Sequence, residues 1–157
     1  MVRIFSLLLL AALCGCTAGA AGSGSASSTL ATTAQTTTIA ISLTASVVTS
    51  TPYGMSGGFM PAVTTVQHGT YIRFVNKDSF AHTSTSLAAT ATTFPAAEPF
   101  TSAALNQSGT TISGGWTTGS LAPGNASQPL LADKPGTYLY GCFFHYGAPM
   151  RAAIVVQ

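Results

Sequence analysis

The C-terminal stretch, residues 136–157, constrains this chain more than any other part of it. Residues 137–140 read as one strand and residues 151–156 as another, and the short segment between them carries Cys142, His145 and Met150. A thiolate, an imidazole and a thioether this close together form a soft ligand set suited to a transition metal. The stretch therefore predicts a metal site on a tight loop between two strands.

The three candidate ligands on this loop are one ligand short of a complete site. One Cys, two His and a weak axial Met are the ligand set expected of an electron-transfer copper. The missing imidazole has to come from elsewhere in the chain, and His82 is the candidate. The sequence thus offers four candidate ligands for one copper ion: His82, Cys142, His145 and Met150.

The N-terminus has the pattern of a targeting segment. Arg3 precedes an apolar run at residues 4–13 that is too short to span a bilayer permanently. The following LCGC sequence resembles the lipobox of bacterial lipoproteins, which implies a signal peptide at residues 1–15 and a lipidated Cys16. Cleavage after Ala20 is the alternative and would release a soluble periplasmic or secreted protein. Both alternatives place the mature protein outside the cytoplasm, the first as a lipoprotein on the periplasmic side of a bacterial membrane.

Residues 16–36 are rich in Ser, Thr, Ala and Gly and predict a flexible tether. Charged residues make up 5% of the chain and the formal net charge is +2. So little charge argues against nucleic acid as a partner and against electrostatic capture by anionic lipid, so that only a lipid anchor would hold the protein to a membrane. Beyond the leader region Cys142 is the single cysteine, and no disulfide is expected in the domain.

The folded domain is expected at residues 37–157, as an all-β sandwich or barrel of about eight strands. Short alternating runs separated by Gly, Pro and Asn turns support this fold class. Residues 49–58 are expected to be turns, and residues 88–115 are ambiguous, with one short helix near 99–106. The expected strands cover residues 37–43, 63–67, 70–76, 82–87, 116–121, 128–132, 138–142 and 151–156.

Two segments resemble one family. VNKDSFAH at residues 75–82 and PGTYLYGCFFHYGAPM at residues 135–150 are similar to the cupredoxins, the small blue copper proteins such as plastocyanin and pseudoazurin. The resemblance implies a Greek-key β-sandwich, a type 1 copper, and electron transfer between redox proteins such as a cytochrome, an oxidase or a reductase. It also implies that His82, Cys142 and His145 are the close ligands and Met150 the long axial one. We expect a monomer.

The same resemblance assigns supporting roles. Thr83 stands where plastocyanins usually have Asn, and with Asn76 it is expected to brace the ligands. His145 is the expected electron port, within an apolar docking surface that includes Pro149 and Phe144. Lys77, Asp78 and Lys134 are interpreted as solvated loop charges, and His68 as a surface residue.

Other functions compete with electron transfer for this sequence. An enzyme is not expected, because the chain has three His and three acidic residues in all and no His-x-His pair for a catalytic copper. Zinc could occupy a Cys and two His, but a Met ligand adds little for zinc. The remaining alternative is a copper carrier or resistance protein that exchanges its metal, with Met55 and Met60 as candidates for a second copper contact.

Overall fold

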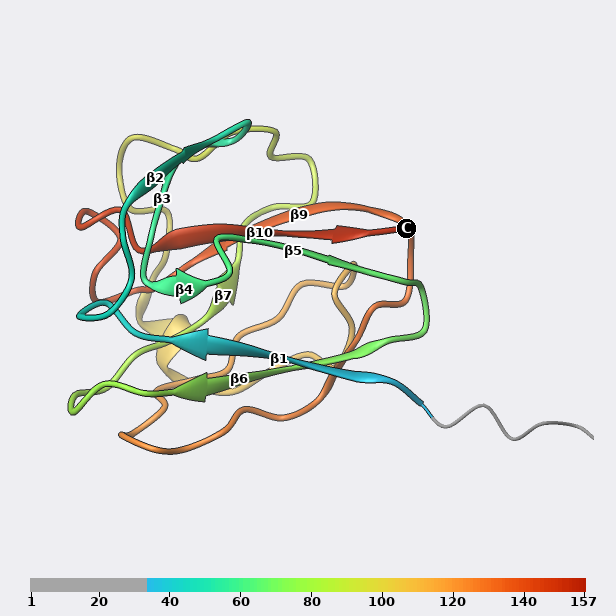
Figure 1. Cartoon of the computed structure of the whole chain (residues 1–157), viewed down its shortest axis with the longest axis horizontal. Coiled ribbons are helices and arrows are strands. Elements are labelled where there is room, and N and C mark those ends of the chain that lie inside the picture. The colour runs from blue at the N-terminus through green and yellow to red at the C-terminus, as the bar shows by residue number, and fades with distance from the viewer. Residues whose placement is uncertain (1–33) are drawn as a thin grey trace, which may run out of the picture. The chain divides into compact units, whose positions relative to one another are not determined.

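The computed structural model describes residues 34–157, so the expected signal peptide, Cys16 and nearly all of the tether lie outside the described residues. The described part contains ten strands and one short 3-10 helix, η1, and in it no helix is long and apolar enough to cross a membrane (Figure 1). The elements are β1 (Thr36–Ile41), β2 (Thr49–Thr51), β3 (Gly54–Ser56), β4 (Phe59–Met60), β5 (Val63–Val66), β6 (Tyr71–Asn76), β7 (Thr85–Ser86), η1 (Ser102–Leu105), β8 (Leu130–Leu131), β9 (Gly136–Gly141) and β10 (Arg151–Val156).

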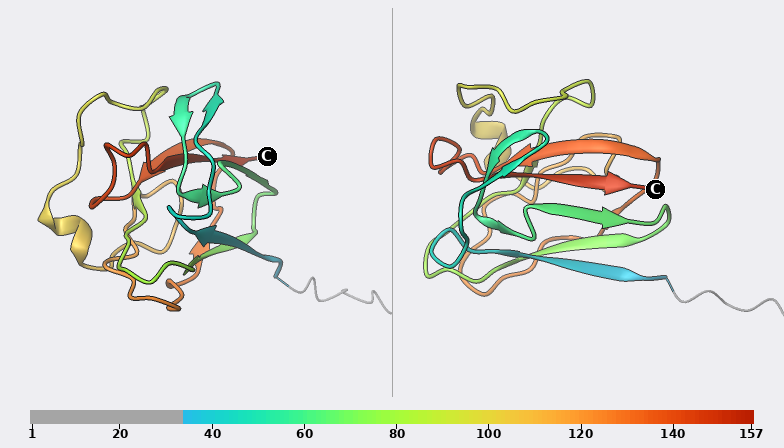
Figure 2. Two further views of the ribbon diagram at one scale, coloured as in Figure 1. Left: turned by 60° about the vertical axis from the view of Figure 1, so that its left-hand side comes forward. Right: turned by 45° about the horizontal axis from the view of Figure 1, so that its top comes forward.

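The strands form two four-stranded sheets and a separate ribbon. One sheet has the order β4-β1-β6-β8, the other β5-β10-β9-β7, and β2 pairs with β3 alone. β1 is parallel to β6 and β5 is parallel to β10, whereas β9 and β10 are antiparallel. Figure 2 shows the two sheets as separate layers. The predicted all-β sandwich is confirmed, with ten strands in place of about eight.

Alternate side chains of both sheets meet in one hydrophobic core. Ile39, Ile41, Ile72, Phe74, Tyr140 and Ile154 are among its fully buried members. Aromatic rings fill the centre: Phe74 stacks on Trp116 at 5.1 Å, and Phe59 meets Tyr140 edge-on at 4.7 Å. Such large rings supply much of the buried apolar area of a small domain, and they fix the positions of the strands that end at the ligand loops.

Two loops from different sheets lie at the same end of the sandwich. The antiparallel register of β9 and β10 pairs Gly141 with Arg151. The loop between them therefore leaves and re-enters the sheet at the same end of these two strands. β6 ends at Asn76 beside the end of β1, and Lys77 donates its backbone N–H to the carbonyl of Ile41 at 2.8 Å. Figure 1 shows both loops at the left-hand end, opposite the C-terminus. The fold therefore brings two distant stretches of sequence together.

Some local expectations were wrong. Residues 49–58, expected to be turns, contain the β2–β3 hairpin. Residues 116–121, expected to be a strand, make only isolated bridges, in which Thr117 pairs with Thr85 and Ser108 and Leu121 pairs with His82. The expected strand at 82–87 is reduced to β7, and the expected helix near 99–106 is the single 3-10 turn η1. The bridges of residues 116–121 join single residues in loops and not a continuous strand. This explains why neither residues 116–121 nor residues 82–87 form the full strand that was expected.

Candidate metal centre

Cys142 directly follows β9, and its side chain is completely buried. Its backbone N–H donates to the carbonyl of Met150 at 3.0 Å, which closes the ligand loop at its base. The backbone N–H of Thr83 donates to Sγ at 3.4 Å. Burial raises the pKa of the Cys142 thiol, although hydrogen bonds from Thr83 and from the loop amides act in the opposite direction. Burial protects the thiol from oxidation, and the hydrogen bonds to Sγ stabilise the thiolate form that a metal binds.

His82 reaches this sulfur from the segment that connects β6 to β7. A two-way backbone bridge with Leu121, at 3.1 and 2.8 Å, holds the His82 backbone in place, and its side chain is fully buried. Nδ1 lies 3.7 Å from Sγ of Cys142, sixty residues away in the sequence. Nε2, on the far side of the ring, lies 2.8 Å from Oδ2 of Asp78. One ring nitrogen is therefore engaged by a carboxylate while the other faces the sulfur.

His145 supplies the second imidazole from the ligand loop itself. Its Nδ1 also lies 3.7 Å from Sγ of Cys142, and its carbonyl accepts hydrogen bonds from the backbone N–H groups of Ala148 and Met150. The side chain is only half-buried. Burial, together with the nearby His82, lowers the pKa of His145, while Asp78 acts in the opposite direction. The neutral ring that a metal requires is thus favoured at neutral pH.

These three donor atoms fit a trigonal metal. All of them lie within 4.8 Å of one another. A metal bound at about 2.3 Å from sulfur and about 2.0 Å from nitrogen, with ligands 120° apart, separates those two atoms by about 3.7 Å, which is the spacing of both Nδ1 atoms from Sγ. The structure thus brings His82, Cys142 and His145 together as the sequence predicted. The same geometry and donors suit copper, with zinc as a possible substitute.

Met150 lies beside this group, and its side chain is completely buried. It packs on Gly58, where a Cβ would lie 3.1 Å from the Met150 sulfur. Its backbone N–H donates to the carbonyl of His145, in the middle of the loop, and its carbonyl accepts from the N–H of Cys142, at the start of the loop. The structure places Met150 against the ligand loop, and its axial role stays a prediction.

Asp78 was interpreted as a solvated loop charge, and that interpretation was wrong. Its side chain is buried behind His82. Burial alone would raise its pKa, but hydrogen bonds from Thr44, Ser42, His82 and the backbone N–H of Leu43 lower the pKa to about 2. The missed signal was the Asp-x3-His spacing, since a carboxylate four residues before a ligand can reach the ring nitrogen that faces away from the metal.

The two predicted bracing residues support different loops. Thr83 Oγ1 accepts a hydrogen bond from the backbone N–H of Phe143 at 2.9 Å, which links the His82 segment to the ligand loop. Asn76 donates from Nδ2 to the carbonyls of Phe80 and Leu121 and accepts from the N–H of Asp78. Thr83 therefore contacts the Cys142 loop directly, whereas Asn76 shapes the turn that presents Asp78 and His82.

Apolar side chains with solvent-exposed surface stand on the ligand loop, which carries the half-buried His145, and on the loop after β1. Phe144 is 43% exposed, Pro149 is half-buried, and Val47 and Val48 are exposed as well. A Cβ on Gly57 would meet both Val48 and the carbonyl of Pro149, which places the loop after β1 beside the ligand loop. We call Phe144, Pro149, Val47 and Val48 the apolar rim. Sequence reasoning named the first two residues, and it missed the two valines because nothing in their local pattern links them to residue 149.

Phe80 lies against both imidazoles. Its ring centroid is 4.8 Å from that of His82 and 5.4 Å from that of His145. An aromatic ring at this place restricts the rotation of both ligand side chains and keeps water away from them. Phe80 thus covers the two imidazoles with apolar surface on the side of residues 77–81.

The ligand loop is also tied to the segment before η1. Tyr146 Oη and Arg151 Nη1 both donate to the carbonyl of Pro95, each at 3.1 Å. The Arg151 guanidinium lies over the rings of Tyr146 and Phe94, at 4.9 and 5.5 Å from their centroids. Arg151 therefore holds this segment against Tyr146, the residue that follows His145.

His68, Met55 and Met60 remain outside the site. His68 is exposed, and its Nε2 lies 3.0 Å from the carbonyl oxygen of Asp133. Met55 and Met60 are 47% and 36% exposed and stand on β3 and β4. Among residues 34–157, the group of close His, Cys, Asp and Glu side chains that could hold a metal does not include His68.

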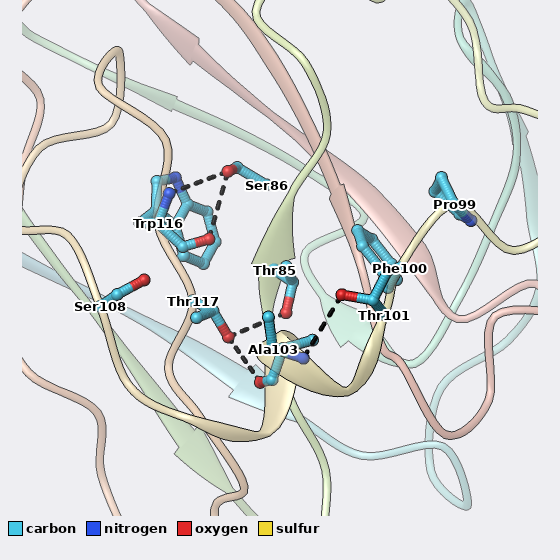
Figure 3. Close-up of a pocket in the computed structure, with 10 residues that line it drawn as sticks. Thr85, Ser86, Pro99, Phe100, Thr101, Ala103, Ser108, Trp116 and Thr117 are labelled. Carbon is cyan, nitrogen blue, oxygen red and sulfur yellow. Dashed lines mark hydrogen bonds between the residues drawn. The ribbon is translucent and has the colours of Figure 1, made fainter.

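A pocket of about 280 Å³ lies away from the metal-binding side chains, between η1, β7 and Trp116 (Figure 3). Its hydroxyl groups are already occupied: Thr117 Oγ1 bonds to Thr85 Oγ1 and to the carbonyl of Ala104, and Ser86 Oγ bonds to the backbone of Trp116. The indole N–H of Trp116, which also lines the pocket, has no hydrogen-bond partner among the described residues.

Comparison with known proteins gives one family match. The sequence profile of the copper-binding proteins of the plastocyanin/azurin family matches residues 45–157. No curated protein sequence matches the chain.

Three solved structures are similar to the chain. A purple cupredoxin from Nitrosopumilus maritimus is 18% identical, with 76% of this chain and 98% of that chain covered and a TM-score of 0.48. A reduced amicyanin variant is 15% identical, with 78% and 82% covered and a TM-score of 0.48. A pseudoazurin from Sinorhizobium meliltoi is 22% identical, with 78% and 74% covered and a TM-score of 0.43.

Proposed function

Because the chain belongs to the plastocyanin/azurin family of copper-binding proteins, we propose that it is an extracytoplasmic blue copper protein that carries single electrons between redox proteins. Copper is the cofactor of this family, and His82, Cys142 and His145 are grouped to hold it. The observation that carries the proposal is the equal 3.7 Å spacing of two imidazole nitrogens from one buried cysteine sulfur.

When bound, copper supplies a one-electron couple between Cu(II) and Cu(I). The chain's own residues hold the three donor atoms in place through Thr83, Asp78 and the Cys142–Met150 backbone bond. A site fixed in this way needs little rearrangement when its charge changes, which favours fast electron transfer. The apolar rim and Phe80 exclude water, and the half-buried His145 is the route by which an electron reaches the surface.

The surface around His145 supports a weakly steered, apolar contact with the partner. Of the three acidic residues in the sequence, Asp78 is buried and Asp133 accepts hydrogen bonds from Ser113. The third, Glu98, is exposed. Without a cluster of charge, the contact depends on Phe144, Pro149 and the two valines. The proposed partner is a redox protein, such as a cytochrome, an oxidase or a reductase, with an apolar surface around its own cofactor. The protein is proposed to act as a monomer and to catalyse no reaction of its own.

A copper carrier is the second candidate function. A carrier has to release its metal, whereas the side chains of His82, Cys142 and Met150 are completely buried here. This burial favours electron transfer over metal exchange. Incubation of the copper-loaded protein with excess chelator separates the two functions: slow loss with reversible one-electron voltammetry supports electron transfer, and rapid loss supports a carrier.

We further propose that Cys16 carries a lipid and anchors the domain to a bacterial membrane on its periplasmic side. The LCGC sequence after a short apolar run supports this location. Mass spectrometry of the mature N-terminus tests it, with Cys16→Ser as the control. A diacylated Cys16 at the N-terminus is expected. A mature protein that begins after Ala20 would contradict the anchor and support the soluble periplasmic or secreted form.

A further inference from the structure

A buried carboxylate stands directly behind one of the three metal-binding side chains. The side chains of Asp78 and His82 are both fully buried, and Oδ2 of Asp78 lies 2.8 Å from Nε2 of His82. The same carboxylate accepts hydrogen bonds from the Ser42 hydroxyl at 2.8 Å, from the Leu43 N–H at 2.6 Å and from the Thr44 hydroxyl. Four donors thus fix its position and its orientation toward the ring.

The direction of each hydrogen bond is set by its chemistry. An ionised carboxylate can only accept, so Nε2 of His82 has to carry a proton and donate it to Asp78. A neutral imidazole carries one proton, and Nδ1 is left with its lone pair. Nδ1 is the atom that lies 3.7 Å from Sγ of Cys142. Asp78 therefore selects the tautomer of His82 that can bind a metal between its own Nδ1 and the sulfur of Cys142.

Among residues 34–157, no lysine or arginine forms an ion pair with Asp78. Lys77, its neighbour in sequence, is exposed, and the ion-pair contact found for Asp78 among residues 34–157 is the one with His82. Hydrogen bonds from neutral groups spread a charge without cancelling it. In a buried environment such a charge acts strongly on a nearby ion, because little water screens it.

We propose that Asp78 is a positioning residue that holds His82 ready for copper and lowers the reduction potential of the copper site. A nearby anion stabilises the more highly charged Cu(II) relative to Cu(I), and a hydrogen bond to a carboxylate makes the ligating ring a stronger electron donor. This inference rests on the proposed function, since it concerns the couple of a bound copper.

Asp78→Asn tests the proposal with little change in shape. The Asn oxygen can replace Oδ2 and keep the hydrogen bonds from Leu43 and His82. Its NH2 group then faces the hydroxyls of Ser42 and Thr44, which can turn to accept. The variant therefore keeps the hydrogen-bond network and removes the charge. We expect the visible copper band to persist, the midpoint potential to shift positive, and Cu(II) affinity to fall about 10- to 100-fold.

Asp133→Asn is the matched control. Asp133 is also a carboxylate held by hydrogen bonds, from the N–H and hydroxyl of Ser113 at 2.9 and 2.5 Å. The six residues of β9 lie between Asp133 and Cys142 in the sequence, and each adds about 3.4 Å along the strand, so the two residues stand at opposite ends of β9. Its substitution removes the same formal charge at the other end of the sandwich, and the midpoint potential is expected to stay unchanged.

Thr44→Val tests the sign of the effect. Valine has the shape of threonine without the hydroxyl that donates to Oδ1 of Asp78. One donor fewer leaves more negative charge facing His82, so the potential is expected to shift negative, opposite to Asp78→Asn. Thr44 is exposed, and the variant is expected to fold. A shift of the same sign in both variants would overturn the inference.

The metal-free wild-type protein gives an independent readout. Nuclear magnetic resonance of the ¹⁵N-labelled histidines is expected to show a slowly exchanging proton on Nε2 of His82. A proton on Nδ1, or an unchanged potential in an Asp78→Asn variant that keeps its visible band, would overturn this inference alone. Absence of the band from the copper-loaded wild-type protein would overturn the proposed function and this inference together.

Discussion

Gly58 packs directly against Met150: a Cβ built on Gly58 would lie 2.3 Å from Cγ of Met150. Gly58 also has a φ of +73°, a conformation that side chains other than glycine adopt at a cost of about 1–2 kcal/mol. Two separate reasons, backbone conformation and lack of space, thus require glycine beside the expected axial ligand.

Gly58→Ala is expected to destabilise the protein and to alter its copper spectrum. The new methyl group has to displace Met150, and overpacking of this kind costs about 1–3 kcal/mol beyond the backbone strain. Denaturant unfolding and the visible spectrum measure the two effects. Gly69→Ala is the matched control, because Gly69 has a φ of +87° with no atom within 4 Å of its Cβ position. Equal losses of stability in the two variants would show that Met150 is free to move.

Met150→Leu is expected to raise the midpoint potential while copper stays bound. Leucine has a similar volume, so the cost in unfolding free energy is expected to be below about 1.5 kcal/mol. The thioether is lost, and with it the expected weak axial ligand, which would tune the copper. Voltammetry of the loaded variant checks the shift. A potential equal to that of the wild-type protein would remove Met150 from the ligand set and leave it as a core residue.

Thr83→Val is expected to lower the unfolding free energy by about 1–3 kcal/mol and to speed copper loss. The substitution leaves the N–H of Phe143 without its acceptor in a partly buried place. Thr83→Ser keeps the hydroxyl and is the control. Unfolding of the metal-free protein and chelator-driven copper release are the measurements. Equal behaviour of the Val and Ser variants would mean that the hydroxyl does not brace the ligand loop.

Asp78 is expected to make the metal-free protein sensitive to acid. Its pKa is lowered from 3.8 to about 2, as hydrogen bonds outweigh the effect of burial. A depressed pKa contributes stability that is present above the unfolded value and is lost as pH falls toward the folded one. The shift corresponds to about 2 kcal/mol, lost between about pH 4 and pH 2.

Denaturant unfolding across this pH range measures that loss. Asp78→Asn should flatten the dependence on pH, and Glu98→Gln, which removes an exposed carboxyl, is the control. If the unfolding free energy of the Asp78→Asn variant fell with pH as steeply as that of the Glu98→Gln variant, the stabilising role of the ionised Asp78 would be contradicted.

The grouping of His82, Cys142 and His145 could be predicted from the sequence because three of the four candidate ligands lie on one loop. The spacing of Cys142, His145 and Met150 is local, and their strands are marked by clear alternation. His82 could be added because the domain has few other histidines. These four positions needed no knowledge of how the sheets pack.

The parts that could not be predicted depend on tertiary contacts. Asp78 has the sequence pattern of a surface charge, and only the donors of residues 42–44, far away in sequence, make its burial possible. Val48 reaches Pro149 because the loop after β1 lies beside the ligand loop. Residues 116–121 alternate like a strand, yet their partners are single residues in loops. Local pattern carries no information about such neighbours.

The central claim is that His82, Cys142 and His145 hold one copper through the Cys142 thiolate. The optical and electron spin resonance spectra of the copper-loaded protein, recorded beside those of Cys142→Ser, test it most directly. We predict an intense blue or green thiolate-to-copper band with one copper per chain, absent from the Cys142→Ser variant. A wild-type protein without that band, or a variant that keeps the wild-type spectrum and redox activity, would contradict the claim.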